Sequence, residues 1–324
     1  MNSMKAKSIN LTSILHFLLE YNTVFICLIL ILVSSLISDA FFTATNLSNL
    51  LRQVSGIGIL SLGMLLVILT GGIDLSVGSM VAMTSVLCGI FILNLPLPLA
   101  VLFTILAGML AGAISGYLVS IHRIAPFIAT LALMTITRGL GFIFSKGSPI
   151  ILAGKGAILT SLGSGYFLGI PNPVILMLLV FISVAVLLRY TVFGRLVIAI
   201  GSNEEAVRLS GIRVRYYKWM VYAISGALGA LAGIISTSRT GVGSPIIGIG
   251  LELDVIAAVV IGGASLNGGK GTALNTLLGV LILGMIGNIM NLLNIPAYPQ
   301  QVIKGIIIIA AVLLQGVNVR SNND

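Results

Sequence analysis

A carboxylate, two hydroxyls and three glycines stand together in an otherwise apolar run, GGIDLSVGSMVAM, from Gly71 to Met83. The polar side chains are Asp74, Ser76 and Ser79. Lipid offers a carboxylate no hydrogen-bond partner, so Asp74 requires a neighbourhood of protein or water. Two interpretations are equally open on physical grounds: a stretch of a transport pathway, or a cap for the helix expected from Leu75 onward.

A second candidate is the longest polar stretch between the central apolar blocks, FGRLVIAIGSNEEAVRLSGIRVRYYKW, from Phe193 to Trp219. Asn203 can cap a short amphipathic helix that Gly211 ends, and acids in its first turn favour the helix dipole. This helix would comprise Glu204, Glu205, Ala206, Arg208 and Leu209 among its residues. It is either a solvated connector with basic anchors or a dock for another protein.

A third stretch, AVVIGGASLNGGKGT from Ala258 to Thr272, contains a Gly-Lys pair but is not a phosphate-binding loop. That loop needs Gly six residues before the Lys and Ser or Thr directly after it, where this chain has Ala264 and Gly271. No ATP hydrolysis by this chemistry is therefore expected. The glycines are expected to make tight turns and close helix contacts instead, as Gly262, Gly263, Gly268, Gly269 and, in the first stretch, Gly71, Gly72 and Gly78.

Composition indicates which elements position these residues. Hydrophobic residues make up 58% of the 324-residue chain and charged residues 8%, against about a quarter in soluble domains, and the mean hydropathy is +1.17. The apolar blocks are long enough for helices that cross a bilayer and lack the alternation of a β-barrel. We predict an all-α integral membrane protein with about ten spans, near 22–38, 51–70, 77–93, 97–120, 125–145, 173–189, 217–237, 251–265, 272–293 and 299–317.

The 17 Lys and Arg, which give a net charge of +9, lie between the apolar blocks. This distribution sets topology and does not form a nucleic-acid-binding face. With a cytoplasmic N-terminus, the residues on the cytoplasmic side are Lys5, Lys7, Arg123, Arg189, Arg195, Arg208, Arg213, Arg215, Lys218, Lys270 and Arg320. Those outside or in the bilayer are Arg52, Arg138, Lys146, Lys155, Arg239 and Lys304. Both termini are therefore expected in the cytoplasm.

The first span also has features of a cleavable signal, because two lysines precede it and Ser38-Asp39-Ala40 follows. Its removal is disfavoured, since the lysines lie far from the apolar run and an odd number of helices would remain. Cys27 and Cys88 fall within predicted spans, and His16 and His122 are isolated. These residues suggest neither a disulfide framework nor a metal site.

The chain is expected to form one membrane domain over residues 1–324, with halves at about 41–145 and 217–317 and a cytoplasmic loop at about 193–216. GIDLSVGSMVAM from Gly72 can be laid on GLELDVIAAVVI from Gly250, and Pro126 matches Pro299 at a similar offset. Five predicted spans separate the equivalent helices, which predicts an inverted internal repeat with a pathway between the halves.

Six motifs in order, from about Phe41 to Leu314, resemble the permease subunit of ribose-type, binding-protein-dependent ABC importers. They are FFTATNLSNLL, GMLLVILTGGIDLSVGS, PFIATLALMTITRG with SKGSPI, GRLVIAIGSNEEAVRLSGI, ELDVIAAVVIGGASLNGGKGT and LLGVLILGMIGNIMNLL. The resemblance implies a dimeric core in the bacterial cytoplasmic membrane, built with a second copy or a paralogue. It also implies an extracytoplasmic binding protein that delivers a monosaccharide, and cytoplasmic ATPase subunits that carry ATP and Mg.

In such importers the segment from Glu204 to Gly211 would be the coupling segment that sits on the ATPase. The chain departs from the loop signature of many ABC importers, because it shows Glu205-Ala206-Val207, Gly211 six residues after Glu205, and no later Leu-Pro. Ala264 also stands where family members often have Thr. The location of the coupling segment follows from the resemblance, whereas its individual contacts do not.

Two other functions, a secondary transporter and a structural scaffold, agree less well with these features. An ion-coupled secondary sugar transporter would need a titratable relay, for which the acids within or beside the spans are Asp74, Glu252 and Asp254. A docking segment has no purpose in such a self-sufficient carrier, and a purely structural scaffold leaves the buried acid without purpose. Within the importer class, the sequence leaves pentoses, hexoses, a sugar-like autoinducer and nucleosides open as substrates.

Overall fold

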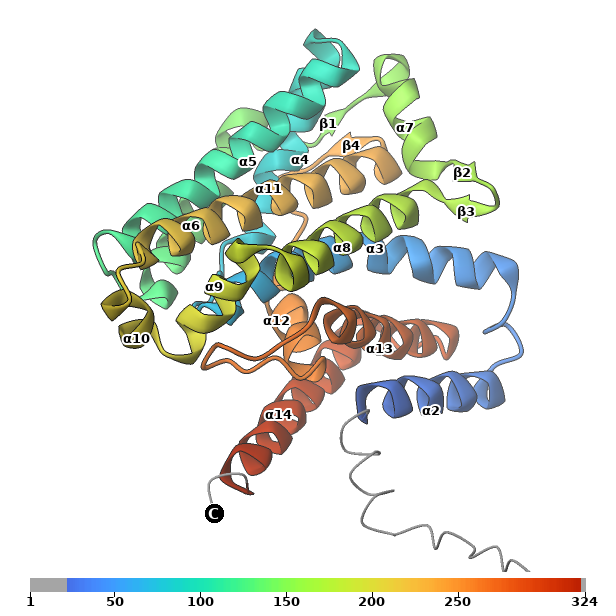
Figure 1. Ribbon diagram of the computed structural model, residues 1–324. Coiled ribbons are helices and arrows are strands. Elements are labelled where there is room, and N and C mark those ends of the chain that lie inside the picture. Colours follow the sequence, from blue (N-terminus) through green and yellow to red (C-terminus); the bar gives the residue numbers. More distant parts are fainter. Residues whose placement is uncertain (1–21, 322–324) are drawn as a thin grey trace, which may run out of the picture.

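The computed structural model describes residues 22–321, and long helices joined by short connections dominate it (Figure 1). The helices are α2 (Asn22–Ile37), α3 (Ala44–Leu69), α4 (Val77–Asn94), α5 (Leu97–Ser120), α6 (Pro126–Ser145), η1 (Ala153–Gly156), α7 (Ala157–Ser164), α8 (Asn172–Tyr190), α9 (Val192–Ser202), α10 (Glu204–Leu209), α11 (Val214–Thr240), α12 (Leu251–Ile261), α13 (Ala273–Leu292) and α14 (Ala297–Ser321). Lys5, Lys7 and His16 lie outside the described residues, so only the basic start of the possible signal segment is not described.

Two very short antiparallel sheets complete the fold. Strand β1 (Ile150–Ile151) pairs with β4 (Val242–Gly243), and β2 (Tyr166–Phe167) pairs with β3 (Ile170–Pro171). Apart from these two-residue strands, the regular structure of residues 22–321 is helical, as the apolar blocks predict.

Seven helices of residues 22–321 are long and apolar enough to cross a membrane: α3, α4, α5, α6, α8, α11 and α13. They contain 18 to 27 residues, or about 27 to 40 Å of helix, which matches a hydrocarbon core of about 30 Å. The predicted multi-pass membrane protein is thereby confirmed. Helices α2, α12 and α14 occupy the other three predicted ranges, but α2 has 16 residues, α12 has 11, and α14 is not among the seven.

The centre of the bundle is formed by α3, α4 and α11, whose apolar stretches are each 72% buried, against 28% for α5 and α6. The outer helices expose large apolar side chains such as Leu110 and Ile143, at 65% and 69%. Exposed apolar residues on the outside and buried ones at the centre are expected of a bundle surrounded by lipid.

Helices α5 and α11 pack through glycines. A Cβ on Gly112 would lie 2.9 Å from the Cα of Gly226, and a Cβ on Gly108 would lie 2.5 Å from the carbonyl oxygen of Gly226. Backbones that approach this closely leave no room for larger side chains. The regular spacing of Gly108, Gly112 and Gly116 in the sequence reflects this contact.

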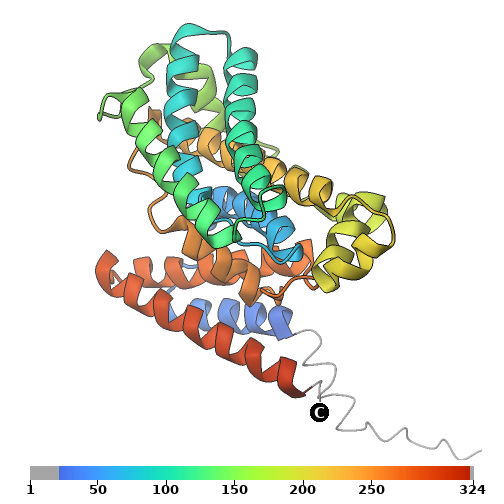
Figure 2. The same cartoon turned by 90° about the vertical axis from the view of Figure 1, so that its left-hand side faces the viewer.

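The two ends of the bundle carry different elements (Figure 1). Helices α9 and α10 lie at one end, whereas α7 and the β2–β3 pair lie at the other. Helices α2, α13 and α14 gather on one side of the bundle, as the view in Figure 2 also shows.

The span predicted at 251–265 begins where α12 begins, at Leu251, but it is too long, because α12 ends at Ile261. Gly248 and Gly250 have φ of +75° and +80°, a left-handed conformation that keeps the helix from starting earlier. The two segments laid on one another also begin their helices differently. Asp74 precedes the first residue of α4, whereas Glu252 lies inside α12. The inverted repeat, the count of ten spans and the side of the termini stay predictions.

Candidate coupling surface and intramembrane polar cluster

Helix α10 forms where the sequence predicts it. The side-chain oxygen of Asn203 accepts a hydrogen bond from the Ala206 amide at 2.9 Å, and Gly211 has a left-handed φ of +80° two residues past the helix end. Val207 is buried in a small apolar cluster, while Leu209 is 76% exposed. The helix is thus anchored on one side and presents an apolar residue on the other.

Two ion pairs order the charged residues of α10. Arg208 binds Glu205 through two hydrogen bonds of 2.5 and 3.0 Å, and Lys218 of α11 donates to Glu204 at 2.5 Å. The hydrogen bonds from Arg208 hold the pKa of Glu205 below its ordinary value, and the same contacts raise the pKa of Arg208. Because Glu205 and Arg208 are exposed, water screens this pair and it contributes little to stability.

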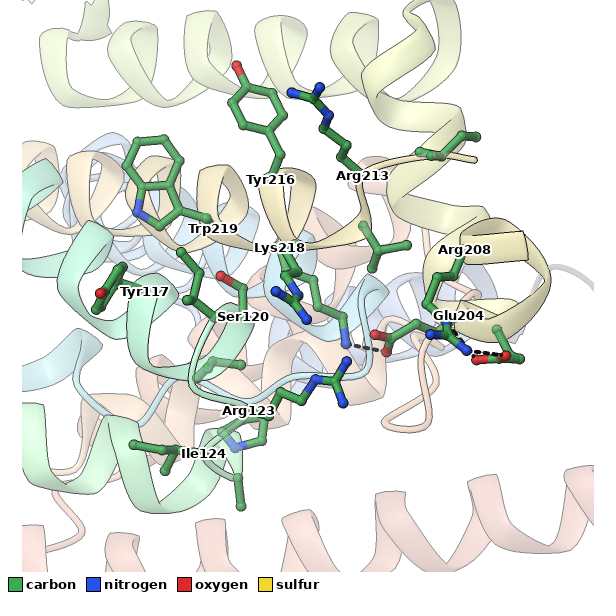
Figure 3. A pocket seen from close by; sticks show the side chains of 18 residues that line it. Tyr117, Ser120, Arg123, Ile124, Glu204, Arg208, Arg213, Tyr216, Lys218 and Trp219 are labelled. Carbon is green, nitrogen blue, oxygen red and sulfur yellow. Dashed lines mark hydrogen bonds and ion pairs between the residues drawn. The ribbon is translucent and has the colours of Figure 1, made fainter. Parts of the chain in front are cut away.

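A groove of about 1320 Å³ lies beside α10, between the end of α5, the α5–α6 connection and the start of α11 (Figure 3). Its cationic residues are Arg123, Arg208, Arg213, Arg215 and Lys218, and its acids are Glu204 and Glu205. Tyr117, Tyr216 and Trp219 also line it. The α10 groove is therefore positively charged, with aromatic side chains of the kind found at membrane interfaces.

Asp74 lies in the connection between α3 and α4, with an exposed fraction of 0%. Its Oδ1 accepts hydrogen bonds from the Ser76 amide at 3.0 Å and the Ser76 hydroxyl at 2.6 Å. Its Oδ2 accepts a hydrogen bond of 3.2 Å from Ser225 of α11. The predicted cap is thus wrong in position, since Ser76 is the N-cap residue and α4 begins at Val77, not Leu75. Asp74 instead closes a turn just before the N-cap residue, and its hydrogen bond with Ser225 joins this turn to α11.

Ser79 joins α4 to α6, because its Oγ lies 2.7 Å from Oγ1 of Thr137 and also donates to the Ser76 carbonyl at 2.8 Å. The next residue on α6, Arg138, donates through Nη1 to the carbonyl oxygens of Pro245 and Ile247 at 2.9 and 2.6 Å. The structure therefore separates Ser79, which bonds to α6, from Asp74, which bonds to Ser76 and to Ser225 of α11.

Glu252, at the start of α12, completes this cluster. Its side chain is 8% exposed, and its buried Oε2 makes no hydrogen bond within the part of the chain that the structure describes. Sequence reasoning missed Thr137 and Ser225, and it gave Arg138 no role. The signal for Arg138 and Glu252 was present, since each is a charged residue inside a predicted span.

The predicted packing glycines fall into two groups. Gly72, Gly78 and Gly262 are close-contact positions, where an added Cβ would meet Tyr222, Glu252 and the Asn275 carbonyl, respectively. The others have left-handed φ and serve turns, and they are Gly71, Gly263, Gly268 and Gly269. Gly268 and Gly269 are also close-contact positions, because an added Cβ would lie 2.9 Å from the Cα atoms of Gly201 and Ser202 of α9, respectively. Gly263 has no neighbour within 4 Å of such a Cβ, so helix packing does not require it.

Metal ligands do not gather anywhere in residues 22–321: no group of three His, Cys, Asp or Glu side chains there could hold an ion. Cys27 and Cys88 are free thiols buried on α2 and α4.

Comparison with known proteins covers most of the chain. Residues 46–312 match the family model described as "Branched-chain amino acid transport system / permease component". The chain is 44% identical to the ribose import permease protein RbsC of Haemophilus influenzae, over 92% of this chain and 93% of that protein. It is 46% identical to the Bacillus subtilis protein of the same name, over 88% and 89%.

A further relative is the L-arabinose ABC transporter permease protein AraH of Azospirillum brasilense, with 39% identity over 90% of this chain and 85% of that protein. No solved structure matches the chain.

Proposed function

This chain belongs to the family of permease components of the branched-chain amino acid transport type, and from that membership we propose that it forms the membrane pathway of an ATP-driven importer for a monosaccharide such as ribose. It is a multi-pass membrane permease, a transport subunit and not an enzyme. As a component of an ABC importer it works with an ATPase and a binding protein. ATP and Mg are bound by the ATPase and not by this chain.

The relatives favour a sugar over an amino acid as the substrate. Although the family description names branched-chain amino acids, the relatives from Haemophilus influenzae and Azospirillum brasilense, which align along nine-tenths of the chain, are named for ribose and L-arabinose. The observation that carries the proposal is this identity of 39 to 46% over nearly full length. A sugar-like autoinducer or a nucleoside remains the second candidate within the same importer class.

Helix α10 is the proposed coupling element. It is capped at Asn203, anchored by Val207, and displays Leu209, Glu205 and Arg208 to the outside. The ATPase would contact this exposed face, and the positively charged α10 groove beside it extends the contact surface. Since Lys218 ties Glu204 to α11, movement of α10 would pass directly into the central helices.

The opposite end of the bundle is proposed to receive the binding protein. With ten spans and both termini in the cytoplasm, α10 faces the cytoplasm and α7 with the β2–β3 pair faces outside, as their placement at opposite ends requires (Figure 1). A second copy of this chain or a paralogue would complete the core, with the pathway lying between the two halves, 41–145 and 217–317, of each copy.

Asp74 is proposed to act as a structural acceptor and not as a pathway residue. All its hydrogen bonds run to the turn before α4 and to Ser225, and it is wholly buried among α3, α4 and α11. A proton relay for an ion-coupled carrier would require an acid open to water, and Asp254 is already paired with Lys304 at 2.8 Å.

The proposed function is tested by reconstituting the chain with its ATPase and binding protein in proteoliposomes. We expect D-ribose uptake that requires ATP on the side of the membrane where the ATPase lies and the binding protein on the opposite side. A protonophore should not inhibit this uptake. Uptake of leucine in place of sugar would overturn the substrate, and ATP-independent uptake that a protonophore stops would overturn the transporter class.

A further inference from the structure

A stretch of non-helical backbone, partly buried in the bundle, lies alongside the first half of α4. Residues 241–250 lead from β4 to α12. The amide of Ser244 donates to the Ser85 hydroxyl at 3.2 Å, and Gly248 lies against Gly78 two helical turns earlier on α4. Irregular backbone at membrane depth is tolerated only where protein covers it or where it lines a water-filled cavity.

Arg138 supplies part of the hydrogen bonding that this backbone needs. Its Nη1 donates to the carbonyl oxygens of Pro245 and Ile247, at 2.9 and 2.6 Å. Both of these bonds use Nη1, and the residue is half-buried within α6. An arginine inside a membrane segment is costly, so a guanidinium at this depth indicates a function beyond bracing the loop.

Glu252 supplies the complementary acceptor. Its Oε2 is buried where α4 and α12 meet, at Gly78 and the Gly248 carbonyl, and accepts no hydrogen bond from the described residues. A buried carboxylate without a partner is unfavourable. Glu252 has room there because Gly78 has no side chain, since a Cβ on Gly78 would lie 2.3 Å from Oε2 of Glu252. The Glu252 carboxylate and the Gly248 carbonyl both lie against Gly78, and Arg138 donates to the carbonyl of the preceding residue, Ile247. The two charged side chains thus reach neighbouring carbonyl groups of one segment, at a point between three elements.

The surroundings keep this point closed. A hydrogen bond between Ser79 and Thr137 joins α4 to α6 beside Gly78 and Arg138, and Met83 and Leu140 pack between the same two helices. The non-helical segment packs there through Gly248 and through the side chain of Ile247. Because Glu252 is 8% exposed, a solute reaches it only when α4, α6 and this segment move apart, and that movement would expose Arg138 and Glu252 together.

We infer that Arg138 and Glu252 form a binding station for the hydroxyl groups of the transported solute within the membrane. The inference rests on the proposed function. A sugar hydroxyl can donate to the Glu252 carboxylate while a neighbouring hydroxyl accepts from the Arg138 guanidinium, and such charge-assisted hydrogen bonds are about twice as strong as neutral ones. The pair has no net charge, so it provides both partners without an electrostatic barrier to a neutral solute.

The first test is Glu252→Gln in the complete complex, in proteoliposomes supplied with D-ribose-loaded binding protein. The amide keeps the size of the side chain but removes its charge. We expect normal assembly, ATPase stimulation by the loaded binding protein within twofold of the unaltered complex, and D-ribose uptake per ATP reduced about tenfold or more. The matched control is Asp254→Asn on the same helix turn, where an amide oxygen still accepts from Lys304, and uptake per ATP should change less than twofold.

Uptake per ATP that stays within twofold in Glu252→Gln, or that falls equally in Asp254→Asn, overturns the inference. If the unaltered complex moves no D-ribose at all, the proposed function itself fails, and the two failures are thereby distinguished.

The second test holds even if the glutamine variant does not assemble. Thr137→Cys, in a background with Cys27→Ala and Cys88→Ala, places a thiol beside Arg138. We expect a small methanethiosulfonate reagent to label this thiol only during ATP turnover, and saturation with D-ribose-loaded binding protein to slow labelling relative to unloaded binding protein. Labelling that the sugar leaves unchanged, or no labelling during turnover, overturns the inference.

Discussion

The ammonium group of Lys218, in the first turns of α11, donates a hydrogen bond of 2.5 Å to the carboxylate of Glu204, the first residue of α10. Lys218 has a side-chain exposure of 19%, whereas Glu204 retains 53%. A surface helix is thus tied by a partly buried ion pair to a 27-residue helix that runs through the centre of the bundle. This relationship links the proposed ATPase contact to the helices around the pathway.

Breaking that pair should weaken coupling. For Glu204→Gln and for Lys218→Gln we expect stimulation of the ATPase by loaded binding protein to fall roughly two- to tenfold. This fall corresponds to an interaction energy between the two residues of about 0.5 to 1.5 kcal/mol. Exchange of the two charges, Glu204→Lys with Lys218→Glu, should restore most of the stimulation. A charge exchange as defective as the single variants would contradict the proposed link.

The end of α10 depends on a conformation that proline cannot adopt. Gly211 has a φ of +80°, whereas proline fixes φ near −65°, so Gly211→Pro should displace the docking helix. We expect transport to be abolished and the ATPase to co-purify poorly, with normal amounts of the chain in the membrane. Charge reversal at Glu205 together with Arg208 should have the same effect.

Gly169 offers a matched control for this prediction. It has the same φ of +80° and equally open surroundings, but it lies between β2 and β3 at the other end of the bundle. Gly169→Pro should leave ATPase co-purification unchanged. Full transport by Gly211→Pro would show that the segment around α10 is only a connector.

Asp74 should tolerate Asn but not Ala. In Asp74→Asn the amide oxygen can still accept from Ser76, and the amide nitrogen can donate to the hydroxyl of Ser225. In Asp74→Ala the buried amide and hydroxyls lose their acceptor, which costs about 1 to 3 kcal/mol each and should reduce membrane-assembled protein. The measurements are immunoblots of the membrane fraction and uptake. Normal assembly with no transport in Asp74→Asn would make Asp74 a pathway residue.

The contact between α5 and α11 should not admit a side chain at Gly112. Because backbone of α11 lies within 2.9 Å of the added Cβ, Gly112→Val must push the helices apart. We expect the free energy of unfolding to fall by about 1 to 3 kcal/mol. Thermal unfolding in detergent measures this effect. Gly139→Val on the open face of α6 is the control, and an equal fall in melting temperature for both variants would contradict the packing argument.

Local features were predictable from the sequence because their signals are local. The cap at Asn203, the stop at Gly211 and the membrane helices follow from residue types at fixed spacing. The turn at Asp74 was visible, but not its bond to Ser225, which lies 151 positions away. Contacts between distant segments depend on helix packing, which one sequence does not reveal.

The end of α12 was missed for a related reason. Residues 251–265 are apolar enough to be predicted as one span, and hydropathy does not register that the helix stops at Ile261 and that Gly263 adopts a left-handed φ of +82°. The charges at Arg138 and Glu252 were visible in the sequence. Their proximity depends on how α6, α12 and residues 241–250 are folded together, and only the structure places them there.

The central claim, that α10 is the surface that meets the ATPase, is tested most directly by photo-crosslinking in the intact complex. The photoreactive residue p-benzoylphenylalanine is introduced in place of Leu209, which is 76% exposed on α10, or in place of Leu168, which is 88% exposed between β2 and β3 at the opposite end. Irradiation of membranes that transport sugar should join the ATPase subunit to the chain at position 209 and not at position 168. Capture of the ATPase at position 168, or its absence at position 209 in an active complex, would contradict the account.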